Sequence, residues 1–114
     1  MPFDFEDFPV YKDAIKFIQE VGVFLESIPQ KGNLRIIDQL QRASTSIALN
    51  IAEGAGRFHK ADKKNFYVIA RGSVYECVAC YQILQAKRLV SAEKYKEFYL
   101  ALNNLAKQLS AMIR

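Results

Sequence analysis

The chain has 114 residues, of which 51% are hydrophobic and 25% are charged, and its formal net charge is +4. This length fits one globular domain, and the mildly basic balance permits a nucleic-acid or other acidic partner without requiring one. No run of about 18 apolar residues is present, so we expect no membrane-spanning helix. The acidic amino-terminal segment, with Asp4, Glu6 and Asp7, is unlike a secretory or mitochondrial signal, which predicts a cytoplasmic protein.

Apolar residues recur at intervals of three and four in four segments, separated by breaks that are mostly rich in glycine, proline or asparagine. This periodicity is typical of amphipathic helices rather than strands. The first helix is predicted at about residues 8–28, because Pro9 suits a first helical turn. Asp7 is expected to cap its amino end.

The second helix is predicted at residues 34–55, where small side chains are frequent and let a neighbouring helix approach closely. Gly54 or Gly56 is expected to adopt the left-handed conformation that ends this helix. The third helix is predicted at residues 62–87, with Asp62 as its cap. It carries apolar stripes on two adjacent faces, so we expect it to have neighbours on both sides.

The fourth helix is predicted at residues 92–113, with Ser91 as its cap. Its apolar residues alternate in steps of three and four from Tyr95 to Met112, which is the heptad spacing of packed helices. Four helices of this length joined by short loops predict one domain over residues 1–114. The expected fold is all-α, an antiparallel up-down-up-down four-helix bundle.

The two cysteines, Cys77 and Cys80, form a CxxC pair inside the third predicted helix. A structural zinc site needs about four ligands, and the sole histidine, His59, lies far away in a loop. We therefore predict that the cysteines pack in the core or an interface, with no metal and no cofactor. No nucleophile–base pair or paired carboxylates converge in the sequence, so we expect no enzymatic activity.

Polar side chains at helical spacing on the second and third helices predict a structural polar network of Arg42, Asn50, Glu53, Arg71, Ser73 and Glu76. Antiparallel pairing about a turn near residue 59 is expected to bring Asn50 or Glu53 to Arg71. It is likewise expected to bring Arg42 to Glu76. Asn50, Glu53, Arg71 and Glu76 should be buried or half-buried in hydrogen-bonded pairs, because an unsatisfied buried polar group costs about 1–3 kcal/mol. The alternative is a ligand-binding or catalytic role.

A basic run lies between the second and third predicted helices and comprises Arg57, His59, Lys60, Lys63 and Lys64. Phe58 and Tyr67 are interleaved with these cations. A cationic patch with aromatic rings suits phosphate contacts and base stacking, which makes the run a candidate nucleic-acid-binding site. The alternative is a helix end whose charges are simply solvated.

Three segments of the chain resemble a known family. Residues 46–57 (SIALNIAEGAGR) resemble the SIPxNIAEGxGR signature of the 23S rRNA intervening-sequence proteins, with alanine in place of proline at Ala48. Residues 70–76 (ARGSVYE) are similar to the ARGSLxE motif that follows it. Residues 5–12 (FEDFPVYK) resemble the start of the family pattern, with Tyr11 where tryptophan is usual.

The resemblance implies a four-helix bundle that assembles into a homopentamer. Relatives serve diversity-generating retroelements as accessory proteins, which implies nucleic acid and a reverse transcriptase as partners. Our leading hypothesis is a non-enzymatic, oligomeric binding module that contacts RNA or another nucleic acid as an accessory factor. The alternative is a protein-binding scaffold that partners a reverse transcriptase or another assembly without contacting nucleic acid.

Overall fold

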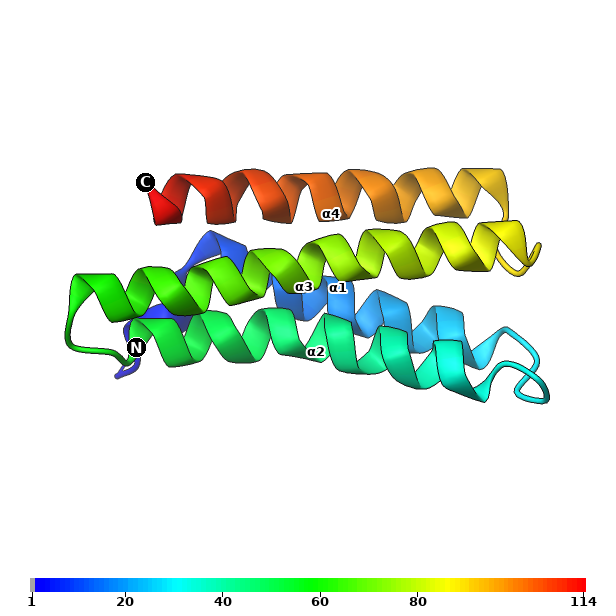
Figure 1. Ribbon diagram of the computed structural model, residues 1–114, viewed down its shortest axis with the longest axis horizontal. Helices are drawn as coiled ribbons and strands as arrows, with labels where there is room; N and C mark the ends of the chain where they lie inside the picture. Colours follow the sequence, from blue (N-terminus) through cyan, green and yellow to red (C-terminus); the bar gives the residue numbers. More distant parts are fainter. Residues whose placement is uncertain (1) are drawn as a thin grey trace.

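The computed structural model describes residues 2–114 and consists of antiparallel helices packed side by side (Figure 1). A short 3-10 helix, η1 (Asp4–Asp7), precedes four α-helices: α1 (Pro9–Glu26), α2 (Leu34–Ala55), α3 (Lys60–Ala86) and α4 (Ala92–Ile113). No strand occurs within this described part of the chain. The predicted all-α four-helix bundle is therefore confirmed.

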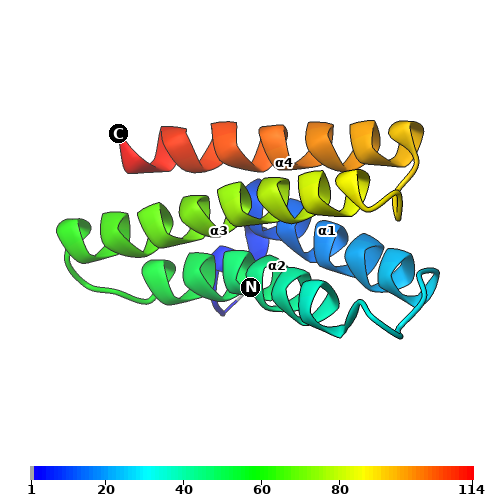
Figure 2. The same ribbon diagram turned by 45° about the vertical axis from the view of Figure 1, so that its right-hand side comes forward.

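Each helix packs against the helix that follows it in the sequence, and α1 closes the ring against α4. Figures 1 and 2 agree that α3 runs between α2 and α4 on one side of the molecule. The bundle is a rod with extents of 44 × 23 × 21 Å. The α2–α3 hairpin lies at one end of the rod together with both ends of the described chain, and the other two interhelical loops lie at the opposite end.

The amino ends of the helices differ from prediction in two of three cases. Phe8, not Asp7, is the N-cap residue of α1. The third helix begins two residues early, with His59 as its N-cap, so that Asp62 lies within the first turn. At α4 the prediction is confirmed, because the Ser91 hydroxyl accepts a 3.0 Å hydrogen bond from the backbone N–H three residues on.

As predicted, α2 ends at a glycine, because Gly56 is its C-cap residue, but the predicted left-handed conformation is wrong. Gly54 lies inside the helix, and Gly56 has an ordinary right-handed φ of −80°. Among the described residues, the left-handed conformation occurs instead at Gly32 (φ 82°) and Arg88 (φ 60°). Arg88 ends α3 by donating its N–H to the Gln85 carbonyl at 3.0 Å, the pattern in which glycine is usual.

Gly54 serves the packing of α2 against α3. A Cβ atom at this position would lie 2.6 Å from Cε1 of Tyr67, well inside van der Waals contact. The absence of a side chain therefore lets the buried Tyr67 ring lie directly against the α2 backbone. The close approach that small residues predicted for this helix pair is found here.

An aromatic cluster fills the core towards the end of the rod that carries the α1–α2 and α3–α4 loops. The Phe98 ring stacks on Tyr81 with centroids 4.3 Å apart. It also packs edge-on against Phe24 at 5.5 Å and Phe17 at 6.1 Å. Because these rings come from α1, α3 and α4, the cluster joins three of the four helices.

The seam between α1 and α4 is the most open of the four helix pairs. It is bridged by Asp13, whose Oδ2 accepts hydrogen bonds from Asn104 Nδ2 at 3.0 Å and from Gln108 Nε2 at 2.8 Å. One carboxylate therefore ties the first helix to the last. None of the described helices is both long and apolar enough to cross a membrane.

Candidate nucleic-acid interface

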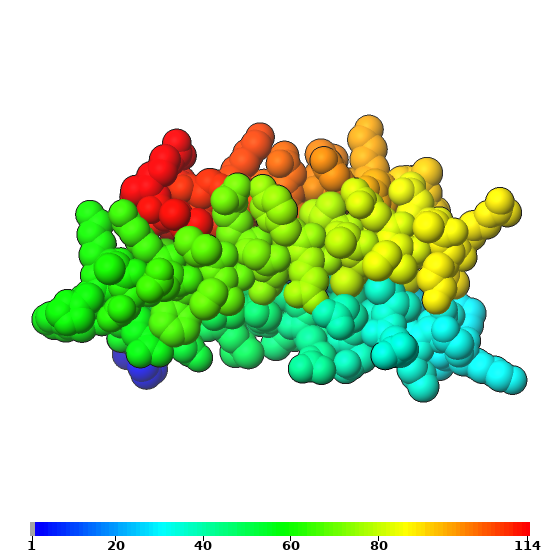
Figure 3. Space-filling model, in the orientation of Figure 1, coloured from blue at the N-terminus to red at the C-terminus, as the bar shows by residue number. Residues whose placement is uncertain are grey.

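The basic run predicted from the sequence forms the tip of the α2–α3 hairpin. The backbone there is pinned on both sides: Gly56 N–H donates to the Ala52 carbonyl at 3.2 Å, and Lys63 N–H donates to the His59 carbonyl at 3.1 Å. Between these anchors, residues 56–59 form the loop. Side chains of this tip project from one end of the rod (Figure 3).

Two of the predicted phosphate-binding residues have partners within the protein. Lys63 Nζ donates a 2.8 Å hydrogen bond to the Ala55 carbonyl, so this ammonium satisfies the carboxyl end of α2. Arg57 Nη2 lies 3.4 Å from Glu53 Oε2, and its guanidinium sits 4.5 Å from the centre of the Phe66 ring. Both side chains therefore help to hold the hairpin together.

The remaining three residues of the run, His59, Lys60 and Lys64, make no ion pair with residues 2–114. His59 and Lys60 are exposed and Lys64 is half-buried. The two lysine charges are available to an anion, and the three residues lie within a few positions of one another at the start of α3. They are the strongest candidates for phosphate contacts at this end of the molecule.

The two aromatic residues interleaved with the cations have different surroundings. Phe58 is 91% exposed, and its ring meets that of His59 edge-on at 5.3 Å. Tyr67 is buried against Gly54, so the expectation that it stacks on a base is wrong. Burial raises the pKa of the Tyr67 hydroxyl, and the charge of Asp4 raises it further. Phe58 is therefore the aromatic group that the tip presents to solvent.

The predicted contact between Arg42 and Glu76 is wrong. Arg42 Nη1 lies 3.6 Å from Asp38 Oδ2, one turn earlier on α2. Glu76 accepts a hydrogen bond from Gln39 Nε2 instead. Both predicted partners are exposed. An ion pair within one helix needs no second helix to be positioned, which favours the local partner for Arg42.

The predicted contact of Arg71 with Asn50 or Glu53 is also wrong. Arg71 Nη2 donates a 3.0 Å hydrogen bond to the Tyr75 hydroxyl, and its guanidinium lies 5.1 Å from the centre of that ring. Glu53 is exposed and pairs with Arg57. Arg71 is half-buried, as expected, but its partner lies on its own helix.

A smaller polar cluster joins α2 to α3. The hydroxyls of Ser46 and Ser73 lie 2.8 Å apart, and Ser73 also donates to the Ile69 carbonyl at 3.3 Å. Asn50 Nδ2 donates to the Ser46 carbonyl at 2.8 Å and to its hydroxyl at 3.0 Å. Because residues two apart on a helix point about 200° apart, α3 presents Ser73 to α2 and turns Arg71 away.

The CxxC pair has the properties of core packing. Cys77 and Cys80 are free and buried in α3. Burial raises the pKa of both thiols above the ordinary value, with a smaller contribution from the neighbouring charge of Glu76. They are therefore thiols rather than reactive thiolates at neutral pH. No group of three or more His, Cys, Asp or Glu side chains in residues 2–114 could hold a metal ion.

A second cationic cluster lies at the opposite end of the rod and was not predicted. Arg35 and Lys87 lie together there and line a surface groove of about 690 Å³. Neither pairs with a carboxylate in the described chain. The cluster is invisible in the sequence because antiparallel α2 and α3 bring together residues that are far apart along the chain.

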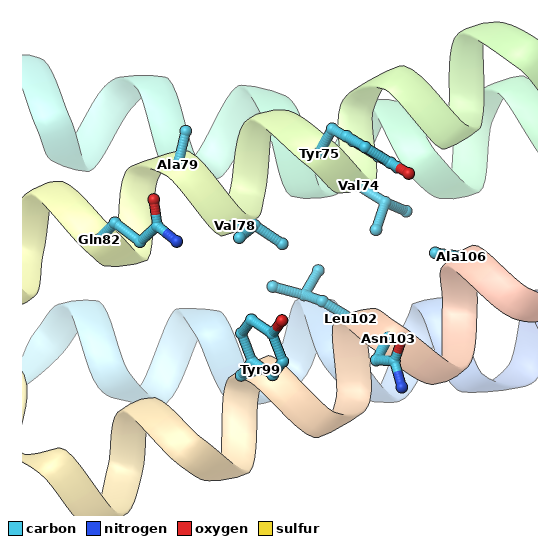
Figure 4. Close-up of a pocket in the computed structure, with 9 residues that line it drawn as sticks. All are labelled: Val74, Tyr75, Val78, Ala79, Gln82, Tyr99, Leu102, Asn103 and Ala106. Atoms are coloured by element: carbon cyan, nitrogen blue, oxygen red, sulfur yellow. The ribbon is translucent and has the colours of Figure 1, made fainter.

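An apolar face covers the outer side of α3. Exposed Val68, Gly72, Tyr75, Ala79 and Ile83 follow one another at intervals of three and four. Beside this row, a groove of about 300 Å³ separates α3 from α4, with Val78 and Gln82 on one side and Tyr99 and Leu102 on the other (Figure 4). Apolar residues at this spacing are typical of a helix that packs against another helix, yet no helix within residues 2–114 covers them.

The chain is similar to known proteins both in sequence and in fold. The model of the family described as 23S rRNA-intervening sequence protein matches residues 6–111. A crystal structure of a protein of unknown function from the S23 ribosomal protein family of Bacteroides thetaiotaomicron VPI-5482 superimposes with a TM-score of 0.83 at 20% identity. The superposition covers 92% of this chain and 98% of the other, which shows a shared fold. No curated protein sequence matches the chain.

Proposed function

The chain belongs to the family of 23S rRNA-intervening sequence proteins, and from this premise we propose that it is a non-enzymatic, self-associating module that binds RNA or another nucleic acid. The observation that carries the proposal is the tip of the α2–α3 hairpin. There, His59, Lys60 and Lys64 have no ion pair with the described residues 2–114, and Phe58, whose ring is 91% exposed, lies among them. Cations attract the phosphate backbone, and an exposed ring offers a surface for a base.

The hairpin contact is tested by charge reversal. In the double variant Lys60→Glu, Lys64→Glu we expect weaker binding to a single-stranded RNA and a flatter salt dependence. Each lost phosphate contact reduces the slope of log K against log salt by about 0.7 for a single strand. Fluorescence anisotropy between about 50 and 200 mM salt measures both quantities. The new carboxylates lie near the amino end of α3, where the helix dipole favours them, so helical content should persist.

The matched control places the same charge change at the other end of the rod. Lys31→Glu, Lys87→Glu removes as many positive charges and adds as many negative ones, but leaves the hairpin intact. We expect this variant to keep most of the parent's affinity and slope. If the two double variants lose binding equally, overall net charge rather than the hairpin determines affinity. If the parent binds no RNA at any salt, the proposed nucleic-acid function is wrong.

Self-association is the second part of the proposal, and the apolar outer face of α3 supports it. Tyr75 is 58% exposed within a row of apolar residues that none of the described helices covers. A homopentamer, as the family resemblance implies, would have about five times the 13.0 kDa mass of one chain. A repeat of the hairpin around such an assembly would multiply the phosphate contacts available to one nucleic acid.

We expect Tyr75→Glu, Ile83→Glu to dissociate the assembly, because a charge buried in an apolar interface without a partner is strongly unfavourable. Light scattering at micromolar concentration should then give the mass of a single chain for this variant and a multiple of it for the parent. Val23→Glu, at a 71% exposed position on α1, is the control and should not alter the mass. A parent that is monomeric at this concentration refutes the self-association proposal.

The apolar face also favours one other function, a scaffold whose partner is a protein. A reverse transcriptase or another assembly could then dock on α3 without any nucleic-acid contact. The two functions differ in the salt titration. The scaffold is the better description if the parent protein binds no RNA and the Tyr75→Glu, Ile83→Glu variant no longer assembles.

A further inference from the structure

The tip of the hairpin carries an exposed aromatic ring that does not take part in core packing. Phe58 is 91% exposed and touches one other ring, that of His59 at 5.3 Å with an interplanar angle of 88°. It lies outside both helices and outside the hydrophobic core. The ring therefore contributes almost no buried surface to the folded chain, and it is accessible to another molecule.

The backbone under Phe58 is fixed on both sides. Arg57 before it donates its N–H to the Gly54 carbonyl at 3.2 Å, and its guanidinium is held over Phe66. After it, His59 starts α3 in extended conformation, while Lys63 Nζ ties the end of α2 to the first turn of α3. A ring projecting from a pinned loop loses little conformational freedom when it binds, which favours a stacking role.

We infer that Phe58 and His59 form a stacking platform for an unpaired base, so that the hairpin takes single-stranded or looped nucleic acid in preference to a continuous duplex. This inference rests on the proposed function and names its ligand class. In the interior of a duplex both faces of each base are covered by neighbouring bases, so the Phe58 ring has no free base face to lie on. In a single strand or loop a base is free to lie on the ring while Lys60 and Lys64 contact the flanking phosphates.

Electrostatic attraction alone predicts the opposite preference, for a duplex over a single strand. A duplex carries a denser array of phosphates than a single strand and releases more counterions per contact, with slopes of about 0.9 against 0.7. A basic patch without an aromatic group should therefore bind a duplex at least as well. A preference for single strands that disappears with the Phe58 ring is the signature of stacking.

The experiment uses the absence of tryptophan from the chain. In Phe58→Trp the single indole lies at the proposed platform, and we expect a single-stranded uridine oligonucleotide to quench its fluorescence while a blunt duplex of equal length leaves it nearly unchanged. Phe58→Ala should weaken single-strand binding by about 5- to 150-fold, as for the loss of one base–aromatic stack. Phe58→Trp should bind the single strand at least as tightly as the parent. Phe3→Ala, which removes another exposed phenylalanine (65%), is the control and should change neither affinity.

The outcomes separate this inference from the proposed function. If Phe58→Ala leaves single-strand binding unchanged, or weakens single strand and duplex equally, the stacking platform is wrong while the charge-reversal result still supports nucleic-acid binding. If the variant lowers the mass of the assembly instead, Phe58 occupies a pocket of a protein partner and the inference is overturned. If the parent binds neither oligonucleotide, both the inference and the proposed function fail.

Discussion

Phe98→Ala is expected to lower the free energy of unfolding by about 3–5 kcal/mol, the range found for truncating a large aromatic core residue. Phe98 is 4% exposed and contacts three other aromatic rings, from α1 and α3. Its removal leaves a cavity that the Tyr81 ring, stacked at 4.3 Å, can fill only in part. Because native domains are stable by only about 5–15 kcal/mol, this loss is a large share of the total stability.

Urea denaturation followed by circular dichroism measures this change, and Phe58→Ala is the matched control. It makes the same chemical change at an exposed residue, where an effect within about 0.5 kcal/mol is expected. A loss below about 1.5 kcal/mol for Phe98→Ala would mean that the aromatic cluster repacks and does not define the core.

Gly54→Val should destabilise the protein by about 1–3 kcal/mol, as for overpacking of a close helix contact. A Cβ atom there lies 2.6 Å from the Tyr67 ring and 3.1 Å from Cβ of Phe66, so α2 and α3 must move apart. Thermal unfolding measures the effect. Gly22→Ala is the contrasting variant, because a Cβ at Gly22 meets nothing within 4 Å. It should stabilise α1 by about 0.8–1.0 kcal/mol through helix propensity. A stable Gly54→Val protein would show that the contact is not tight.

The fold was predictable because the apolar periodicity of each helix is strong and the loops are short. The predicted bounds of α2 and α4 coincide with those of the structure. The helix ends were predicted less well, because capping preferences are weak and several residues compete. Asp62 is a good cap by type, yet α3 gains another half-turn by starting after His59. Gly54 suggested a stop by its type, whereas its actual use, contact with Tyr67, depends on a distant segment.

The basic tip was predictable because its residues are consecutive, so any hairpin gathers them. Which aromatic group it exposes was not, since Phe58 lies in the loop before α3, whereas the burial of Tyr67 depends on the direction in which α3 turns its side chain. The polar pairings failed for the same reason. A single residue rotates a side chain by about 100° around a helix. Counting residues from the turn therefore predicts which turns of α2 and α3 lie side by side, but not which side chains face one another.

The closure of the ring by α1 and α4 bears on how fast and in what order the chain folds. Three of the four helix pairs join sequence neighbours, and such local topologies fold in microseconds to milliseconds. The Asp13 bonds to Asn104 and Gln108 span 91 and 95 residues, so they carry the largest loop-closure cost and should form after the folding transition state. Loss of the Asp13 carboxylate then leaves the folding rate nearly unchanged and speeds unfolding. The contact between α1 and α4, which we expect to form last in folding, therefore controls the rate at which the bundle unfolds.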